Sequence, residues 1–126
     1  MKDYKAYFAI PATPDEVYAA LTNALSLELM TGEKAEMSTE VNSEFSLWDG
    51  SIVGKNLEFE ENKKIVQQWY FDSETAESIV TLKFHPHKGS TSLELRQTNI
   101  PNEDYDDLIE GWNNVYIAAL IEFFQE

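Results

Sequence analysis

The sequence predicts an α+β fold in which a curved antiparallel sheet of about six or seven strands wraps around a long C-terminal helix. The first observation behind this prediction is a hydrophobic period of two that runs from residue 35 to residue 98 and is typical of strands. The second is Asp49-Gly50 between two apolar runs, a strong hairpin signal because both residues tolerate positive φ. The third is an aromatic stripe at helical spacing near the end of the chain, which is the large apolar surface available to cover the sheet.

The N-terminal elements are a short strand and two short helices. Residues 5–10 form the strand, and Pro11 ends it. Thr13 is placed to cap a helix, Pro14 fits its first position, and Glu16 completes a capping box. Apolar residues then recur at helical spacing as far as Leu25: Val17, Tyr18, Ala20, Leu21, Ala24 and Leu25. A second helical piece covers residues 27–30 and stops at Gly32.

The central part of the chain is predicted to be a meander of strands. The expected ranges are 35–41, 44–48, 52–60, 64–71, 77–85 and 91–98, with loops at 61–63, 72–75 and 85–89. Side chains at alternate positions should share the inner face, and these are Ile65, Gln67, Trp69 and Phe71, then Val80, Leu82 and Phe84, then Leu93 and Leu95.

The last element is a long helix that begins after Pro101. Asn102 is a good cap, and the acids that follow it favour the positive end of the helix dipole. The apolar stripe consists of Leu108, Trp112, Tyr116, Ala119 and Phe123. Gly111 lowers helix propensity by about 1 kcal/mol relative to Ala, so it indicates close packing or a bend above a cavity.

Composition restricts the classes of function. The 126 residues are expected to form one domain, 1–126, and the lack of cysteine fits a reducing cytoplasm. A net charge of −14 and a single arginine, Arg96, argue against nucleic-acid binding and against anionic membranes. No stretch approaches the roughly 20 apolar residues of a membrane span, and the first residues lack the apolar run of a signal peptide. The acids either keep the protein soluble or face a basic partner.

Several blocks, in order along nearly the whole chain, resemble one protein family. These blocks are Phe45–Gly50, Gly54, Lys64–Trp69, Ser78–Leu82, Thr91–Leu95, Ile100-Pro101 and Gly111-Trp112. The sequence is similar to the C-terminal domain of the activator of the 90-kilodalton heat-shock protein's ATPase, and to its bacterial single-domain relatives. The resemblance implies the helix-grip fold of the START-like (SRPBCC) superfamily.

The resemblance implies two different kinds of function. One is a non-enzymatic, chaperone-linked binding protein of the stress response, with a 90-kilodalton heat-shock chaperone homologue as its partner. In the two-domain activators a separate N-terminal domain carries an Asn-Asn-Trp-His-Trp-type motif, and Trp112-Asn113-Asn114 does not match its order. The alternative is a carrier or sensor of a small hydrophobic or aromatic ligand held between the sheet and the C-terminal helix. Some helix-grip relatives are enzymes, but the predicted inner faces contain no paired titratable groups, so no catalytic residue is expected.

The expected ligand cavity would be lined by inward-facing residues of the sheet and the helix: Gln67, Trp69, Phe71, Leu82, Phe84, Leu95, Trp112 and Tyr116. The same aromatic residues could equally be ordinary core. Gln67 needs a hydrogen-bond partner if it faces inward, which could be a ligand, a water or a backbone group. Trp48 beside the tight turn either caps the end of the barrel or contacts a protein partner.

The remaining polar clusters are expected to be structural. His85 and His87 read as a solvated turn without a third metal ligand, and the acids 103–107 lack the spacing of a calcium loop. Lys63 and Lys64, with Lys88, are either a basic patch or solvated loop charges. We therefore expect no metal and no cofactor. A sheet closed by a helix leaves few free edges, which favours a monomer.

Overall fold

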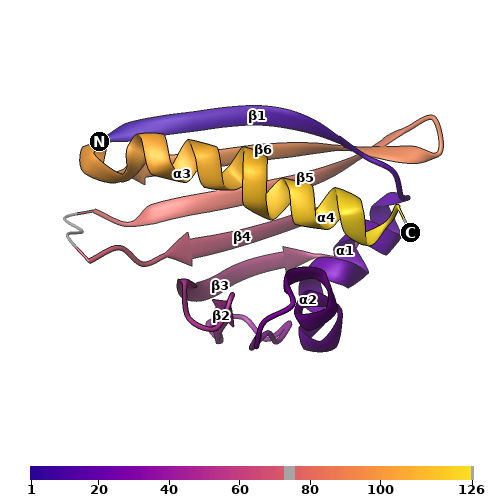
Figure 1. The fold of residues 1–126 in the computed structure, drawn as a ribbon, viewed down its shortest axis with the longest axis horizontal. Helices are drawn as coiled ribbons and strands as arrows, with labels where there is room; N and C mark the ends of the chain where they lie inside the picture. The colour runs from indigo at the N-terminus through magenta and orange to yellow at the C-terminus, as the bar shows by residue number, and fades with distance from the viewer. Residues whose placement is uncertain (73–75, 126) are drawn as a thin grey trace.

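A six-stranded antiparallel sheet forms one layer of the protein, in a computed structural model that describes residues 1–72 and 76–125 (Figure 1). Its strand order is β1-β6-β5-β4-β3-β2. The strands are β1 (Lys2–Ile10), β2 (Glu44–Leu47), β3 (Ile52–Glu60), β4 (Lys64–Trp69), β5 (Ser78–His87) and β6 (Ser90–Ile100). The predicted α+β architecture is confirmed. The sheet is open, with β1 and β2 as its edges, so the monomer stays a prediction.

The second layer is helical and lies on one face of the sheet, in front of it in Figure 1. The C-terminal helix is built from consecutive turns: η1 (Asn102–Asp104), α3 (Tyr105–Gly111), the π-helical η2 (Trp112–Tyr116) and α4 (Ile117–Phe123). The two short helices, α1 (Pro14–Thr22) and α2 (Ala24–Thr31), lie near its C-terminal end. None of the helices in the described part of the chain is long and apolar enough to cross a membrane.

The boundary between α1 and α2 differs from the prediction, which carried the first helix to Leu25. Asn23 has an extended backbone (φ −121°, ψ 124°), and its side chain accepts a hydrogen bond from the Ser26 amide at 3.0 Å. It therefore ends one helix and caps the next. The capping box at the start of α1 is confirmed, because the Thr13 amide donates to the Glu16 carboxylate at 2.9 Å.

The strand predicted at 35–41 is wrong. The segment makes a single antiparallel bridge, between Glu36 and Ser46. Asn56 of β3 makes hydrogen bonds to this part of the chain. Its side-chain amide donates to the Ser38 carbonyl, and its backbone carbonyl accepts from the Asn42 amide. These contacts replace the ladder that an edge strand would need.

The turns also differ in detail from the predictions. The hairpin at Asp49-Gly50 is confirmed, but its loop spans four residues, 48–51, because Leu47 pairs with Ile52. The loop predicted at 85–89 is wrong, since β5 continues to His87 and the turn is the residue pair 88–89, both at positive φ. β4 ends at Trp69, before the predicted end at residue 71. Part of the predicted loop 72–75 lies outside the described residues.

The core lies between the inner face of the sheet and the helices. Alternate residues of β5 and β6 point into it as predicted, and Leu82, Leu93 and Leu95 are 0–1% exposed. Ile117 and Leu120 of α4 belong to the same cluster. Gly54 lets β3 lie close to β4 and to the Phe45 ring, because a Cβ there would overlap the Gln68 carbonyl oxygen and lie 2.8 Å from that ring.

Candidate functional site

A cleft of about 670 Å³ opens at the end of the sheet where the C-terminal helix begins. Three segments form its walls: the turn and first residues of β3 at 48–53, the end of β4 and the residues after it at 69–72, and the helix from η1 to η2. The cleft therefore lies between sheet and helix, as predicted for a ligand, but at one end of their interface.

The floor of the cleft is a cluster of aromatic rings. Trp69 of β4 stacks on Trp112 of η2, with ring centroids 4.8 Å apart and planes 19° apart. Tyr116 lies one turn along the helix, and its ring centroid is 4.5 Å from that of Trp112. The ring of Trp48 covers Tyr116 at 5.6 Å. Trp69 and Trp112, both expected to line the space between sheet and helix, are therefore in contact, whereas Phe71 makes no ring contact with them among the described aromatic pairs.

A π-helical turn brings Trp112 and Tyr116 to the floor. The Ile117 amide donates to the Trp112 carbonyl, five residues earlier, and π turns of this kind recur at functional sites. Gly111, just before this turn, lines the cleft, and a Cβ on it would meet no atom within 4 Å. Of the two readings of Gly111, the irregular turn above a cavity fits the structure and close packing does not.

The indole of Trp69 begins a buried polar relay. Its Nε1–H donates to Gln67 Oε1 at 3.0 Å, and Gln67 Nε2 donates to Asn56 Oδ1 at 3.0 Å. Asn56 Nδ2 then donates to Ser43 Oγ at 3.1 Å. The partners of Gln67 are thus protein side chains, and its position gives no indication of a ligand. Asn56 was missed by the sequence analysis because its inward direction depends on the register shift between Asn56 and Glu58.

The indole of Trp112 begins a second relay. Its Nε1–H donates to Gln97 Oε1 at 2.9 Å, and Gln97 Nε2 donates to Ser78 Oγ at 3.0 Å. Ser78 Oγ donates to the Thr98 carbonyl at 2.9 Å. Gln97 was also missed, although it continues the inward alternation of Leu93 and Leu95. In the described residues, no buried side-chain nitrogen or oxygen lacks a partner.

The predicted lining residues divide into two groups. Trp69, Phe71, Trp112 and Tyr116 line the cleft. The other four, Gln67, Leu82, Phe84 and Leu95, are buried but are not among its lining residues. The ring of Phe84, for example, packs edge-on against Tyr18 of α1 at 5.9 Å. Alternation along a strand predicts which side chains face inward. Whether an inward side chain lies in the core or lines the cleft depends on which helix covers it.

Trp48 sits on the rim of the cleft in an uncommon backbone conformation. Its φ is +52°, which a bulky residue adopts only when surrounding contacts hold it there. The half-buried ring packs against Tyr116 and still lines the opening. Of the two sequence readings, the covering role is present in the structure, and the partner contact stays a proposal.

Carboxylates surround the mouth of the cleft. Asp72 stands on the sheet side, and Glu103, Asp104 and Asp107 stand on the helix side. None of the described lining residues is basic. Burial raises the pKa of the Tyr116 phenol, which therefore stays neutral at physiological pH. No group of metal-ligating side chains occurs among residues 1–72 and 76–125.

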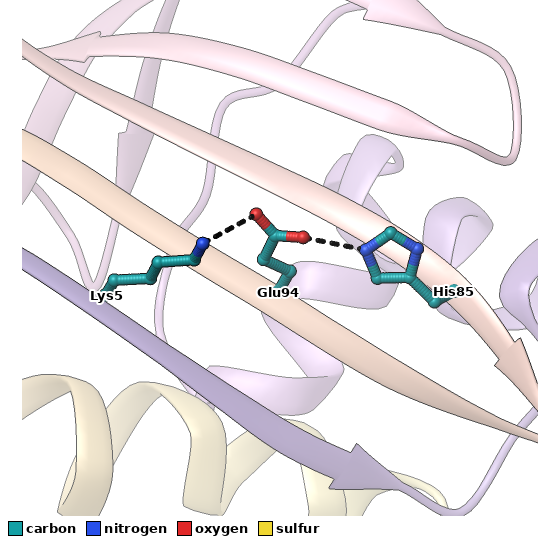
Figure 2. Close-up of polar contacts among 3 residues, drawn as sticks. All are labelled: Lys5, His85 and Glu94. Atoms are coloured by element: carbon teal, nitrogen blue, oxygen red, sulfur yellow. Dashed lines mark hydrogen bonds and ion pairs between the residues drawn. The ribbon is translucent and has the colours of Figure 1, made fainter.

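His85 lies on the outer face of the sheet, away from the cleft. It is part of β5 rather than the predicted turn, and its Nε2 is 2.8 Å from Glu94 Oε1 (Figure 2). Glu94 of β6 also reaches Lys5 of β1, with 3.9 Å between Oε2 and Nζ. The hydrogen bond with His85, followed by the nearby lysines, lowers the pKa of Glu94. The sequence analysis missed this carboxylate because only the strand register brings it beside His85.

The basic residues gather differently from the predicted patch. Lys63 and Lys64 lie beside Lys83 around a shallow depression, whereas Lys88 is not part of it. Lys64 Nζ is 2.9 Å from a Glu58 carboxylate oxygen. This hydrogen bond raises the pKa of Lys64. The arrangement gives Lys64 a structural role on the sheet surface.

Comparison with known proteins agrees with the fold and with the resemblance. Residues 11–125 match the family described as "Activator of Hsp90 ATPase homolog 1-like protein". A crystal structure of an Hsp90 activator from Plasmodium falciparum is similar to this chain at 28% identity and a TM-score of 0.83, covering 94% of this chain and 92% of that one.

Two curated relatives are much longer than this chain. An activator of 90 kDa heat shock protein ATPase homolog from Dictyostelium discoideum is 35% identical over 103 residues, which are 79% of this chain and 27% of that protein. A human homolog 1 of the same activator is 25% identical over 89% of this chain and 34% of that protein. The chain thus spans about a third of the length of these relatives or less.

Proposed function

This chain belongs to the family of Activator of Hsp90 ATPase homolog 1-like proteins, and from that membership we propose that it is a non-catalytic binding domain for a chaperone of the 90-kilodalton heat-shock class. The observation that carries the proposal is the similarity to the Plasmodium falciparum Hsp90 activator, which extends over 92% of that solved chain. A unit of this size is therefore comparable with a solved chain that is named an activator.

The chemistry of the cleft supports binding rather than catalysis. Among the described residues that line it there is no histidine, lysine or cysteine, and its acidic side chains lie at the mouth and not on the aromatic floor. His85, a candidate base, is exposed on the opposite face of the sheet from the buried Gln67.

We assign the partner contact to the rim of the cleft. Val115 is 50% exposed and Val53 is 36% exposed, and both line the opening together with Trp48. Tryptophan is enriched at interface hot spots, and the surrounding contacts exclude water from it. The positive φ of Trp48 supports the same assignment, because backbone strain is retained at functional sites.

Calorimetry with the purified chaperone of the same organism tests this proposal. Val115→Asp on the rim should weaken binding about tenfold or more, because it places a charge inside an apolar contact. Leu29→Asp is the matched control, since Leu29 is 70% exposed on α2, outside the cleft. Absence of binding at tens of micromolar in low salt, or equal effects of both variants, would overturn the proposal.

The cleft supports a second candidate function, carriage of a small apolar ligand. Its volume of about 670 Å³ lies within the roughly 300–1,000 Å³ of small-molecule sites. A ¹⁵N–¹H correlation titration with naphthylmethanol, an uncharged aromatic alcohol, tests it. Saturable shifts of the indole signals of Trp48 and Trp112 support a site in the cleft. A titration that moves neither signal contradicts it.

A further inference from the structure

We propose that the cleft selects organic cations, that is, small molecules in which an ammonium group is attached to an aromatic or alkyl body. The inference rests on the second candidate function, and it adds the charge of the ligand. Three features of the cleft support it. The cleft is lined by aromatic residues, the charges at its mouth are negative, and the two buried indole N–H donors near it are already hydrogen-bonded within the protein.

Aromatic rings line the cleft, of which Trp48, Tyr70 and Phe71 are partly exposed, whereas Trp69, Trp112 and Tyr116 are at most 4% exposed. The faces of such rings carry negative electrostatic potential and attract ammonium groups, and clustered rings are the usual recognition element for quaternary ammonium.

The charges at the mouth have one sign, and they stand on both sides of it. Asp72 follows β4, whereas Asp104 and Asp107 lie across the opening on the helix. Asp72 and Asp107 are exposed at this opening. A cation on the aromatic floor would be attracted by carboxylates from both walls, and an anion of the same shape would be repelled by them.

The buried donors near the floor are already used. The indole N–H of Trp69 donates to Gln67, and the indole N–H of Trp112 donates to Gln97. These two donors could otherwise bind a carboxylate, a phosphate or a carbonyl group. Both indole donors are committed within the protein, and the charged side chains among the described lining residues are all carboxylates, which favour a cation over an anion.

Three ligands with one naphthalene body and different charges test the proposal. These are naphthylmethyl-trimethylammonium, uncharged naphthylmethanol and anionic naphthylacetate, each titrated while the indole signals of Trp48 and Trp112 are followed. The cation should bind about tenfold more tightly than the alcohol, and the anion most weakly. Equal affinity of cation and alcohol, or preference for the anion, would overturn the charge selection while leaving a ligand site in place. Silence with all three compounds would reject the ligand site as well.

Two double variants separate the cleft carboxylates from the overall charge. Asp72→Asn with Asp107→Asn removes two charges from opposite sides of the mouth, and Glu33→Gln with Glu40→Gln removes two exposed charges that are not among the lining residues. The first pair should reduce the preference for the cation several-fold without changing the affinity of the alcohol. The second pair should leave the preference nearly unchanged. Equal losses in both would mean that the net charge of −14 attracts the cation, which contradicts a selective cleft.

Discussion

At the scale of single residues, the aromatic floor of the cleft depends on polar side chains beneath it. Gln67 is 4% exposed and accepts from Trp69 while donating to Asn56. It fixes the edge of one indole and ties that indole to the chain near Ser43. The same residue that suggested a ligand from the sequence is therefore part of the scaffold.

Gln67→Leu should destabilise the protein by about 2–4 kcal/mol, because it leaves a buried indole N–H and the side-chain oxygen Oδ1 of Asn56 without partners. Gln68→Leu is the matched control on the less buried side of β4, and it should change stability by about 0.5 kcal/mol or less. Urea unfolding followed by tryptophan fluorescence measures both. Equal midpoints for the two variants would contradict the relay.

Gly54→Ala should destabilise the protein by about 3 kcal/mol, because the new methyl group would overlap the Gln68 carbonyl oxygen. The clash is with backbone of the neighbouring strand, so it cannot be relieved by a rotamer change. Thermal unfolding by circular dichroism measures the effect. A variant that unfolds at the wild-type temperature would show that β3 and β4 can separate freely at this point.

The site residues that could be predicted from the sequence are those whose position follows from the spacing of apolar residues along a single element. Trp69, Trp112 and Tyr116 were found from periods of two and of helical spacing, which need no knowledge of neighbours. Gln97 carried the same local signal and was not used. Asn56 and Glu94 could not be placed, because their partners are set by strand register and a register shift, which are properties of the assembled sheet.

At the scale of elements, the C-terminal helix joins a regular N-terminal turn to a π turn at the cleft. Gly111→Ala should stabilise the protein by about 0.5–1 kcal/mol, since the position is helical (φ −61°) and a Cβ there would meet open space. Chemical unfolding midpoints at constant m-value measure the gain. A loss of stability would indicate that the π turn requires glycine before it.

The outer face of the sheet carries a ladder of charges across β1, β6 and β5, formed by Lys5, Glu94 and His85 (Figure 2). Folding lowers the pKa of Glu94 from its ordinary value of 4.5, so the unfolded chain takes up this proton first as pH falls. The stability contributed by Glu94 is therefore present above about pH 4.5 and is lost as pH falls through the folded pKa.

Glu94→Gln should consequently lower the unfolding free energy by up to about 1 kcal/mol near pH 7, the range of partly exposed ion pairs. The difference from the wild type should shrink as pH falls below about 4.5 and vanish below the folded pKa of Glu94. Urea titrations at several pH values measure this. A difference that stays constant down to the acidic limit would mean that the carboxylate charge is not what stabilises the ladder.

Element boundaries were predicted well where a local sequence motif sets them. They were predicted poorly where contacts with distant parts of the chain set them. The capping box of Thr13 and Glu16 has a local signature, and the helix starts there. The segment 35–41 alternates like a strand, yet Asn56 engages its backbone and leaves one bridge. Phe71 continues the alternation of β4, but the strand ends two residues earlier, at Trp69.

At the scale of the whole molecule, the excess of 23 acids over 9 bases acts on the folded state as self-repulsion. The melting temperature should therefore rise as sodium chloride is increased from about 0.02 M to 0.5 M, since the screening length falls below the spacing of surface charges. Differential scanning calorimetry measures the rise, and potassium chloride should reproduce it. A falling melting temperature would mean that attractive ion pairs outweigh repulsion.

The stacked indoles of Trp69 and Trp112 give the protein a built-in optical reporter. The two ring planes are 19° apart with centroids 4.8 Å apart, so we expect their electronic transitions to couple and to give a paired positive and negative band in circular dichroism. One ring belongs to a strand and the other to the C-terminal helix, so the signal depends on docking between layers and not on secondary structure. Loss of this band during heating would report the temperature at which the C-terminal helix separates from the sheet. A change of the band on addition of a ligand would report a change in the packing of the two indoles.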